Sequence, residues 1–341
     1  GYARNNCTCA KGAIVIHVPY ADTFGEHDIY SVQHGKATDS IIHGMMLGID
    51  LGGTKISGIV LDQAGVTLAY QRVATPAGDY QATLQSIADL VAALERDVGK
   101  ACSIGVGTPG AISPATGKLR NSNSVCLNAM PLKADLEQLL GRPIFMANDA
   151  DCFTLSEATN GAAADADSVF GVILGTGTGG GLVINGKLVV GKNAIAGEWG
   201  HNPLPWMTAC EYPGDSCYCG KQGCIETFLS GPAMQRHYTM TYGGELDARA
   251  IASQVEHDEN AAVFMTLYVD RLARALANVI NIVDPEIIVL GGGLSNIDLL
   301  YDQVPLVWGK YVFSDVVATR LVKHVHGDDS GVRGAAQLSM N

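Results

Sequence analysis

Short apolar runs separated by glycine-rich turns mark the start of the regular part of the chain. Runs at 46–51, 56–61 and 66–73 are strand-like, and Gly-Gly-Thr and Asp-Gln-Ala-Gly turns separate them, which is typical of a meander. Apolar residues at three- and four-residue spacing over 84–98 then predict a helix, and the run at 103–107 predicts a buried strand. The first unit therefore reads strand, strand, strand, helix, strand.

The next part of the chain alternates helices and strands and then repeats the first unit. A helix from about residue 132, a strand at 144–146 and a helix at 149–159 are typical of an α/β fold. A second set comes after them, with strands at 168–174, 181–184 and 187–190, helices at about 230–240 and 261–283, and a strand at 286–290. Two similar units predict two lobes that face each other across a cleft.

The same pattern gives the domain boundaries. We assign residues 45–155 to an N-terminal lobe and residues 156–330 to a C-terminal lobe. A last helix, at about 331–341, can pack on the N-terminal or on the C-terminal lobe. Residues 1–44 follow no helical period and lack the features of a secretory signal. We expect them to be an extension outside the core fold, and a metal site formed by their cysteines and histidines is the alternative.

Composition and charge exclude several classes of protein. With 341 residues, 47% of them hydrophobic, the chain can bury a large core, which excludes intrinsic disorder. The net charge is 22 − 34 = −12, without any basic run, which disfavours nucleic acid and anionic membranes as partners. Nine cysteines at irregular spacing do not form a secreted disulfide framework. We therefore expect a cytoplasmic protein that binds small molecules.

Glycine-rich turns occupy matching places in the two units. One follows the first strand, at 50–55, and the other follows the strand 168–174, at 175–181. Backbone N–H groups of such turns can approach a phosphate closely, so a pair can hold a polyphosphate from both sides. Ordinary hairpin turns are the alternative. A third run, at 291–293, lies between a strand and a predicted helix and can accept an adenine ring or a phosphate, or serve only as a packing turn. The candidate nucleotide residues are Asp50, Gly52, Gly53, Thr54, Lys55, Gly175, Thr176, Gly177, Gly291, Gly292 and Gly293.

A carboxylate lies directly after the strand 144–146, where the cleft is predicted. This is Asp149, preceded by Asn148. A carboxylate at such a place can accept the proton of a substrate hydroxyl while its oxygen attacks phosphorus. Asp149 is therefore the candidate general base. The alternative is an ordinary helix N-cap, because Asn and Asp are common at that position.

Three cysteines and one histidine have the spacing of a zinc site. Cys217, Cys219 and Cys224 lie within eight residues, and His201 precedes them by sixteen, a set typical of tetrahedral zinc with a closed, structural coordination shell. The segment 203–224 has no apolar pattern to hold it folded, which favours a metal over buried free cysteines. Two carboxylates, Glu198 and Glu226, flank this loop and are candidate sugar contacts together with the imidazole.

Taken together, these motifs resemble the ROK family (repressor, open reading frame, kinase) of sugar kinases over about residues 46–337. The motifs that carry the resemblance are Asp50-Leu-Gly-Gly-Thr-Lys55, Asn148-Asp149, Gly175-Thr-Gly-Thr-Gly-Gly180, Glu198-Trp-Gly-His201 and Cys217-Tyr-Cys-Gly-Lys-Gln-Gly-Cys-Ile-Glu226. Within the family, bacterial fructokinases look most similar, from the runs 109–117, 121–124 and 197–206.

The resemblance implies a fold, cofactors and residue roles. The fold is α/β, of the actin/hexokinase-like (ribonuclease H-like) two-lobed type with a zinc-bound loop at 201–226, usually a homodimer, and ATP, Mg²⁺ and structural Zn²⁺ are the cofactors. Asp149 is similar to the catalytic base and Asp50 to the carboxylate that positions the magnesium-bound phosphates. The residues similar to sugar contacts are Asn123, Asn148, Asp149, Glu198, His201 and Glu226.

The activity implied is ATP-dependent phosphorylation of the primary hydroxyl of a hexose, first of all D-fructose to fructose 6-phosphate. An N-acetylglucosamine kinase, or a glucokinase or mannokinase of the same family, is the alternative. A second alternative is a sugar-sensing protein without catalysis, related to the repressors of the family. Residues 1–44 are short and lack amphipathic helices and a basic face, which argues against a DNA-binding domain.

Overall fold

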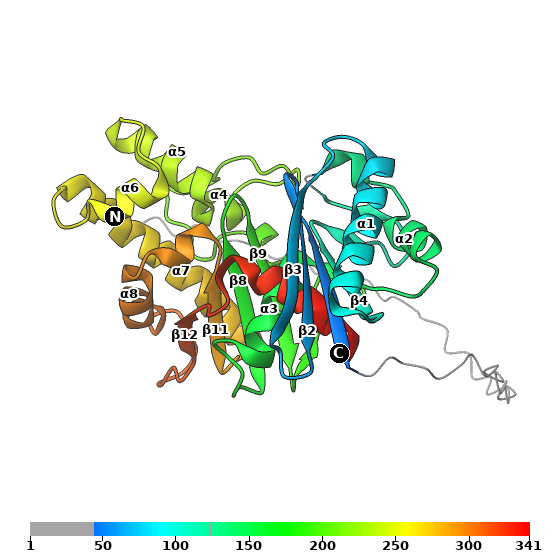
Figure 1. Ribbon diagram of the computed structural model, residues 1–341. Helices are drawn as coiled ribbons and strands as arrows, with labels where there is room; N and C mark the ends of the chain where they lie inside the picture. The colour runs from blue at the N-terminus through cyan, green and yellow to red at the C-terminus, as the bar shows by residue number, and fades with distance from the viewer. Residues whose placement is uncertain (1–43, 123) are drawn as a thin grey trace, which may run out of the picture. The chain divides into compact units, whose positions relative to one another are not determined.

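The computed structural model describes residues 44–122 and 124–341 (Figure 1). The expectations for residues 1–43 as an extension or a metal site, and for Asn123 as a sugar contact, lie outside the described residues. They stay predictions.

Two five-stranded sheets with the same topology organise the chain. In the first, the spatial order is β3 (Thr67–Ala74), β2 (Lys55–Asp62), β1 (Met45–Leu51), β4 (Ser103–Thr108) and β7 (Phe145–Asn148). In the second, it is β10 (Lys187–Leu188), β9 (Thr178–Ile184), β8 (Ser168–Leu174), β11 (Ile287–Gly291) and β12 (Arg320–Lys323). Each sheet has an antiparallel meander on one side and parallel strands on the other. The prediction of two similar units is therefore confirmed.

Helices cover the sheets and fill the connections. They are α1 (Tyr80–Val98), α2 (Leu132–Leu140), α3 (Asp149–Asn160), α4 (Glu226–Leu229), α5 (Gly231–Tyr242), α6 (Ala248–Ser253), α7 (Glu259–Val283), α8 (Leu299–Trp308) and α9 (Ser330–Gln337). In α1, Asp79 caps the N-terminus through a hydrogen bond from the Ala82 N–H, and Gly99 ends the helix in the left-handed conformation. The apolar stripe of α7 lies in the core beside the second sheet.

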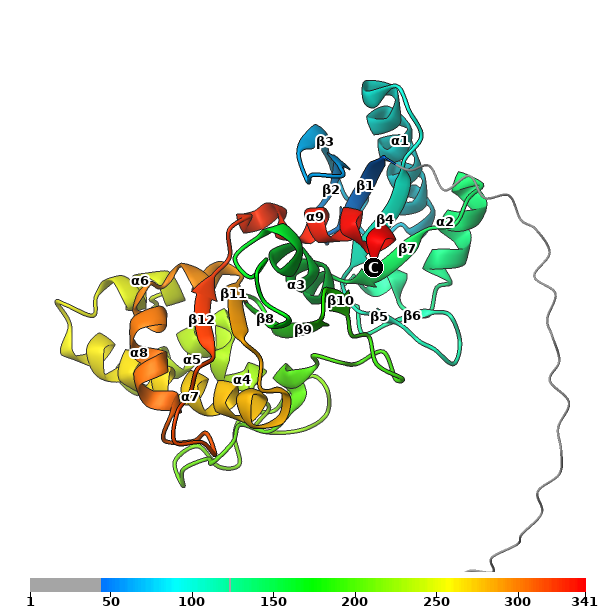
Figure 2. The same ribbon diagram turned by 90° about the horizontal axis from the view of Figure 1, so that it is seen from below.

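Helices α3 and α9 lie between the two sheets and touch each other (Figures 1 and 2). Helix α9 packs on β1, β2 and β4, whereas α3 packs on β8 and β9. Glycines allow this close approach, because a Cβ on Gly105 of β4 would lie 1.8 Å from the Ala335 carbonyl oxygen and a Cβ on Gly171 of β8 would lie 1.9 Å from Thr154 Oγ1. Each of these two helices is thus seated directly on the strand backbone of one sheet.

Several features depart from the sequence expectations. The short hairpin of β5 (Ala111–Ile112) and β6 (Leu119–Arg120) and strand β12 are not predicted from the apolar pattern. The strand expected at 187–190 ends at Leu188. After the third glycine run the chain forms a 3₁₀ turn, Gly293–Asn296, and α8 begins only at Leu299. The hydroxyl of Ser295 donates to the Gly292 carbonyl, 2.6 Å away, which holds this tight turn.

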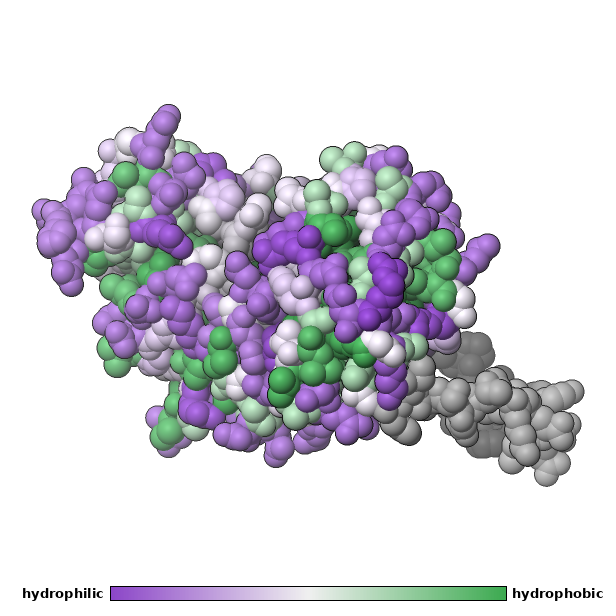
Figure 3. Space-filling model, viewed as in Figure 1, coloured by the Kyte–Doolittle hydropathy of each residue, from purple (hydrophilic) through white to green (hydrophobic). Residues whose placement is uncertain are grey.

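Polar residues cover most of the face in Figure 3, with apolar side chains scattered between them. In the described ranges, no helix has the length and apolarity needed to cross a membrane.

Candidate active site

The first glycine hairpin, between β1 and β2, borders a cavity lined by three carboxylates. This cavity of about 270 Å³, here called the Asp50 cavity, is lined among others by Asp50, Gly52, Gly53, Asp149 and Gly292. The hairpin is closed by a hydrogen bond of 3.0 Å from the Gly52 N–H to the Lys55 carbonyl. The other two candidates, Thr54 and Lys55, are exposed and do not line this cavity.

Burial raises the pKa of the Asp50 carboxyl to about 6, and the neighbouring charge of Asp149 acts in the same direction. The positive charges of Lys55 and Arg72 oppose this shift of the pKa. Lys55 therefore acts on the cavity through its charge, although its side chain lies outside the lining.

The second glycine hairpin, between β8 and β9, is tied to the elements around it. The Gly175 N–H donates to the Gly177 carbonyl at 3.0 Å, and the Gly175 carbonyl accepts from the Gly231 N–H at 2.8 Å. The Thr178 N–H donates to Glu226 Oε2 at 2.9 Å. This hairpin is therefore fixed from α4 and α5.

The residues of the third glycine run have different roles: two of them line cavities, and one allows close packing. Gly293 lines a cavity of about 640 Å³, the Gly293 cavity, whose walls also include Gly175 and Thr176. Gly292 has a φ of 79° and lines the Asp50 cavity. Gly291 lines neither, and a Cβ at this position would meet the ring of Phe153 at 2.4 Å. Its role is close packing, the alternative that the sequence left open.

Asn148 and Asp149 lie at the junction of β7 and α3. The N-cap of α3 is Asn148, whose Oδ1 accepts from the Asp151 N–H at 2.6 Å. Asn148, and not Asp149, is therefore the residue that caps this helix. Asp149 Oδ1 accepts from the Ala150 N–H at 2.8 Å. Both residues line a cavity of about 750 Å³, the His201 cavity, and Asp149 also lines the Asp50 cavity.

The Asp149 carboxyl is reached by solvent through the cavities, but protein surrounds it on the other sides. Desolvation is the main cause that raises its pKa above the ordinary value, and the charge of Glu198 adds to it, while the hydrogen bond from the Ala150 N–H opposes the shift. A carboxylate with a raised pKa is a better proton acceptor than an ordinary aspartate.

The His201 cavity also gathers the remaining candidate sugar contacts. Glu198, His201 and Glu226 all line it, together with Thr176 and Gly177 of the second hairpin. Glu198 is exposed, whereas one oxygen of Glu226 is engaged by the Thr178 N–H. Carboxylates, an imidazole and the side-chain amide of Asn148 thus border one space with Asp149.

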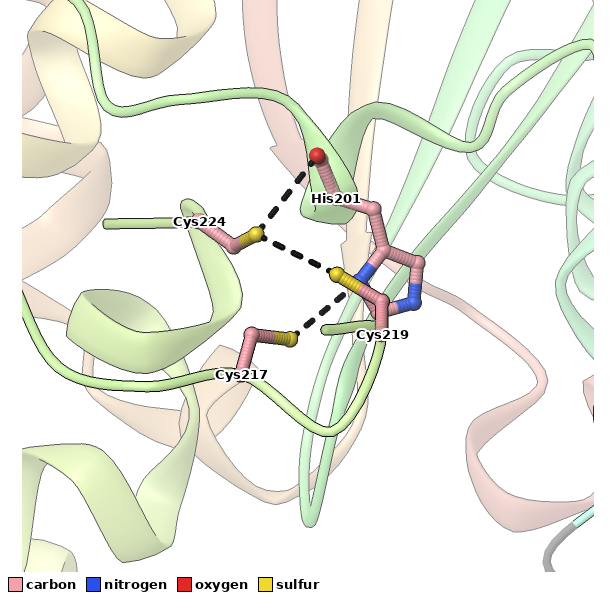
Figure 4. A group of neighbouring side chains, drawn as sticks. All are labelled: His201, Cys217, Cys219 and Cys224. Atoms are coloured by element: carbon pink, nitrogen blue, oxygen red, sulfur yellow. Dashed lines mark hydrogen bonds between the residues drawn. The ribbon is translucent and has the colours of Figure 1, made fainter. Parts of the chain in front are cut away.

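The predicted zinc ligands converge on one another (Figure 4), and two of them, His201 and Cys219, line the His201 cavity. One ligand atom each from His201, Cys217, Cys219 and Cys224 lies within 4.8 Å of all the others. The distances from Cys217 Sγ to His201 Nδ1 and from Cys219 Sγ to Cys224 Sγ are both 3.6 Å. Zn–S bonds of about 2.3 Å and a Zn–N bond of about 2.0 Å at tetrahedral angles place ligand atoms roughly 3.5–3.8 Å apart, so the donor set fits zinc.

The histidine faces two ways. Its Nδ1 lies toward the sulfurs, while its Nε2 is 2.9 Å from the hydroxyl of Tyr218. The ring of Tyr218 meets the imidazole edge-on, with centroids 5.1 Å apart. A metal at the four ligands would therefore fix the orientation of an imidazole and a phenol that both line the His201 cavity.

A buried ionic cluster, which the sequence pattern did not indicate, holds the other end of the zinc loop. The carboxylate of Glu211 pairs with Arg271 and Arg274 of α7 at 2.8 Å each. Arg274 is 2% exposed and also donates to the carbonyls of Pro205 and Trp206. Charge pairs therefore anchor part of segment 203–224 where apolar residues are missing, in addition to the predicted metal.

A second buried carboxylate holds a segment that borders the Asp50 cavity. Glu157 of α3 is 0% exposed and accepts hydrogen bonds from the N–H groups of Ala162, Val325 and His326 and from the Ser330 hydroxyl, all at 3.1 Å or less. These bonds hold the crossover segment, residues 324–330, which leads from β12 to α9. Its residues Gly327, Asp328 and Ser330 line the Asp50 cavity.

Several residues of the site were missed by sequence reasoning. Asn121 and Tyr218 line the His201 cavity. Tyr218 stands between two zinc ligands, and this spacer position is the signal that could have identified it. Asp151 is 6% exposed, and its Oδ1 has no hydrogen-bond partner among the described residues. Burial, followed by the charges of Glu198 and Asp149, raises the pKa of Asp151 to about 8.

Comparison with known proteins places this geometry in a family. A family model described as "ROK family" matches residues 46–341. An N-acetyl-D-glucosamine kinase of Vibrio vulnificus (strain YJ016) is 40% identical over 302 residues, which cover 87% of this chain and 99% of that protein.

Two solved structures support the fold. The ROK hexokinase from Thermus thermophilus gives a TM-score of 0.77 at 29% identity and covers 86% of this chain and 97% of its own. A ROK family glucokinase from Streptomyces griseus in complex with glucose and AMPPNP gives 0.70 at 27% identity, with 86% and 99% covered. These matches confirm the two-lobed, hexokinase-like α/β fold, and the chain belongs to the ROK family.

Proposed function

We propose that the chain transfers the γ-phosphoryl group of ATP to the primary hydroxyl of a hexose, with N-acetylglucosamine as the substrate of first choice. The observation that carries this proposal is the place of Asp149, which lines the Asp50 cavity and the His201 cavity at once. A base that assists phosphoryl transfer must reach the acceptor hydroxyl close to the phosphate. N-acetylglucosamine kinases at 38–40% identity favour that sugar over fructose, which the motifs alone had put first.

Each cavity has a chemistry that suits one part of the reaction. The glycine hairpins at 52–53 and 175–177 offer backbone N–H groups to the polyphosphate. The Gly293 cavity, at about 640 Å³, has room for the base and ribose. In the His201 cavity, Glu198 and Glu226 accept hydrogen bonds from sugar hydroxyls, and Asn148 donates one.

The chain's own residues then act by position and charge. The sugar's primary hydroxyl lies against Asp149, whose carboxylate accepts its proton as the oxygen bonds to the γ-phosphorus. Lobes that close over both substrates exclude water and favour transfer to the sugar over hydrolysis. Positioning of the substrates is the main contribution to catalysis expected of such a site, because phosphoryl transfer needs little covalent catalysis by the protein.

Two metal ions belong to this proposal. Oxygen ligands from Asp50 and Asp328 border the Asp50 cavity, a donor set that suits Mg²⁺ bound to nucleotide phosphates. Such an ion neutralises charge on the phosphates. Zn²⁺ at His201, Cys217, Cys219 and Cys224 would be structural, because the four ligands fill its shell. A homodimer, which the family resemblance implies, stays a prediction for light scattering to test.

A coupled assay of ADP formation over a panel of hexoses tests the proposal. We expect turnover with N-acetylglucosamine, and slower turnover with glucose, mannose and fructose. ADP formation that does not depend on any of these sugars, or sugar binding without ADP formation, would favour the non-catalytic, sugar-sensing alternative. ³¹P spectra of the product establish which hydroxyl carries the phosphate.

A further inference from the structure

A second large cavity adjoins the His201 cavity and has no part in the proposed phosphorylation of a single hexose. This Ser113 cavity measures about 960 Å³ and is bordered by the hairpin of β5 and β6. It shares five residues with the His201 cavity, namely Asn121, Thr176, Gly177, Tyr218 and Glu226. A ligand in one cavity can therefore extend into the other across this common wall.

The sizes of the two cavities exceed what one hexose needs. Pockets that enclose whole small ligands measure about 300–1,000 Å³. The His201 cavity, at about 750 Å³, already lies within this range on its own. A single hexose placed there leaves the Ser113 cavity without a ligand.

Asp149 fixes which end of the sugar faces the second cavity. It lines the His201 cavity but not the Ser113 cavity. A pyranose whose C6 hydroxyl lies at Asp149 points the opposite side of its ring, with C1 and C2, away from that residue. Tyr218 and Glu226, which line both cavities, lie on the wall through which substituents at these carbons can pass.

The lining of the Ser113 cavity is suited to a sugar ring. Ser113 and Thr116 provide hydroxyl groups, and Lys118 adds a cation that donates hydrogen bonds. Tyr218 is 76% exposed, and its hydroxyl is held 2.9 Å from His201 Nε2. An exposed and oriented aromatic ring beside convergent polar groups offers an apolar platform for the face of a sugar.

We propose that the Ser113 cavity binds a second sugar ring attached at C1 of the ring that is phosphorylated. The chain then acts on β-linked disaccharides of N-acetylglucosamine as well as on the monosaccharide, an inference that rests on the proposed function. In this reaction the C6 oxygen of the terminal ring bonds to the γ-phosphorus, and the bond from that phosphorus to the β,γ-bridging oxygen breaks. The C6 hydroxyl proton passes to Asp149, ADP leaves, and the second ring is unchanged.

Three sugars test the proposal on the wild-type chain. We expect the β-1,4-linked dimer of N-acetylglucosamine to be phosphorylated with a kcat/KM within about tenfold of the monosaccharide. N-acetylglucosamine with a methyl group on its C4 oxygen should be a poor substrate, because C4 lies beside C6 and its substituent points to the Asp149 wall. Phosphorylation of the monosaccharide without the dimer overturns the inference and leaves the proposed function standing. Turnover with neither sugar rejects both.

A matched pair of variants locates the second ring. Ser113 keeps its hairpin through backbone bonds, with its N–H donating to the Lys118 carbonyl at 2.9 Å, so Ser113→Trp fills the cavity without removing that bond. The control is Ala115→Trp at the exposed tip of the same hairpin, outside the lining. We expect Ser113→Trp to lower kcat/KM for the dimer by about tenfold or more while the value for the monosaccharide is kept.

The control variant should change neither value. Equal losses for both sugars in Ser113→Trp, or equal effects of the two variants on the dimer, would contradict a second ring at this place. Melting temperatures of the two variants show that each is folded.

Discussion

The two glycine hairpins occupy the same position in two sheets of the same topology, yet they are held in different ways. The first, at 52–53, is closed by its own backbone bond and by Thr75 at the end of the same meander, whose hydroxyl donates to the Gly52 carbonyl at 2.8 Å. The crossover segment that Glu157 fixes lines the same cavity. The second, at 175–177, is tied by Glu226 to the loop that carries the zinc ligands. The two hairpins therefore share their place in the sheet topology, but only the second is coupled to the zinc loop and the candidate sugar contacts beside it.

The largest expected effect comes from the residue at which the two halves meet. Asp149→Asn keeps the shape of the side chain but removes the base, so we expect kcat to fall about 10²–10⁴-fold while the dissociation constant of the sugar changes little. Steady-state kinetics and calorimetry measure the two quantities. Because the pKa of Asp149 is raised, activity of the wild-type chain should increase with pH above the ordinary aspartate range. Turnover close to wild type in the variant would exclude Asp149 as the base.

Loss of a zinc ligand should act on the second hairpin more than on the first. Cys219→Ala removes one of four ligands, and we expect a loss of zinc affinity greater than the about 10–100-fold typical of changes outside the ligand shell. The sugar KM should rise, because the metal orients His201 and Tyr218, whereas the ATP KM should change less. Metal content by mass spectrometry and the two KM values provide the check.

The buried pairs of Glu211 bear on how that variant folds. If the ion pairs of Glu211 keep their part of the zinc loop in place without the metal, Cys219→Ala remains folded, with a lower melting temperature. Substitution of an exposed cysteine outside the ligand set, Cys210→Ala, is the matched control and should leave zinc content and both KM values as they are. An equal rise of the ATP and sugar KM in Cys219→Ala would contradict the separate coupling of the two hairpins.

The reverse pattern is expected for the crossover segment. Glu157→Gln turns one acceptor oxygen into a donor that faces backbone N–H groups or the Ser330 hydroxyl, which should cost about 1–3 kcal/mol of unfolding free energy. Because the segment lines the Asp50 cavity, the ATP KM should rise while sugar binding is kept. Urea denaturation and the two KM values test this. A rise in the sugar KM alone would show that the crossover segment serves the other side of the site.

The smallest effect on activity is expected at Asp151, whose substitution changes the pH dependence of stability instead. Asp151 has a pKa of about 8 in the folded chain against an ordinary value of 3.8, so the folded state binds more protons between these values. The free energy of unfolding therefore falls as pH rises through this window. Asp151→Asn has no titrating carboxyl and therefore escapes this fall in unfolding free energy. We expect its melting temperature to exceed that of the wild-type chain by more at pH 8 than at pH 5. A gain that is the same at both pH values would mean that the carboxyl titrates normally.

Local patterns predicted much of this molecule, and long-range contacts did not follow from them. The meanders, α7 and the zinc ligands have spacings of a few residues, so periodicity and motif distance identify them. The hydrogen bond from the Val325 N–H to Glu157 joins residues 168 positions apart, and the ion pair of Glu211 with Arg271 spans 60. The bounds of helix α8 were not predicted, because Pro305 lies inside it and interrupts the helical pattern.

The contact between α3 and α9 limits how the lobes can move. A Cβ on Gly334 would lie 1.7 Å from the Cys152 carbonyl oxygen, so the two helix backbones touch where they cross. At this point no side chain separates the two backbones, so the helices cannot approach each other further. Closure over a substrate is then expected as a shear, with one helix sliding along the other, and spin labels on the two helices would report a displacement along their axes.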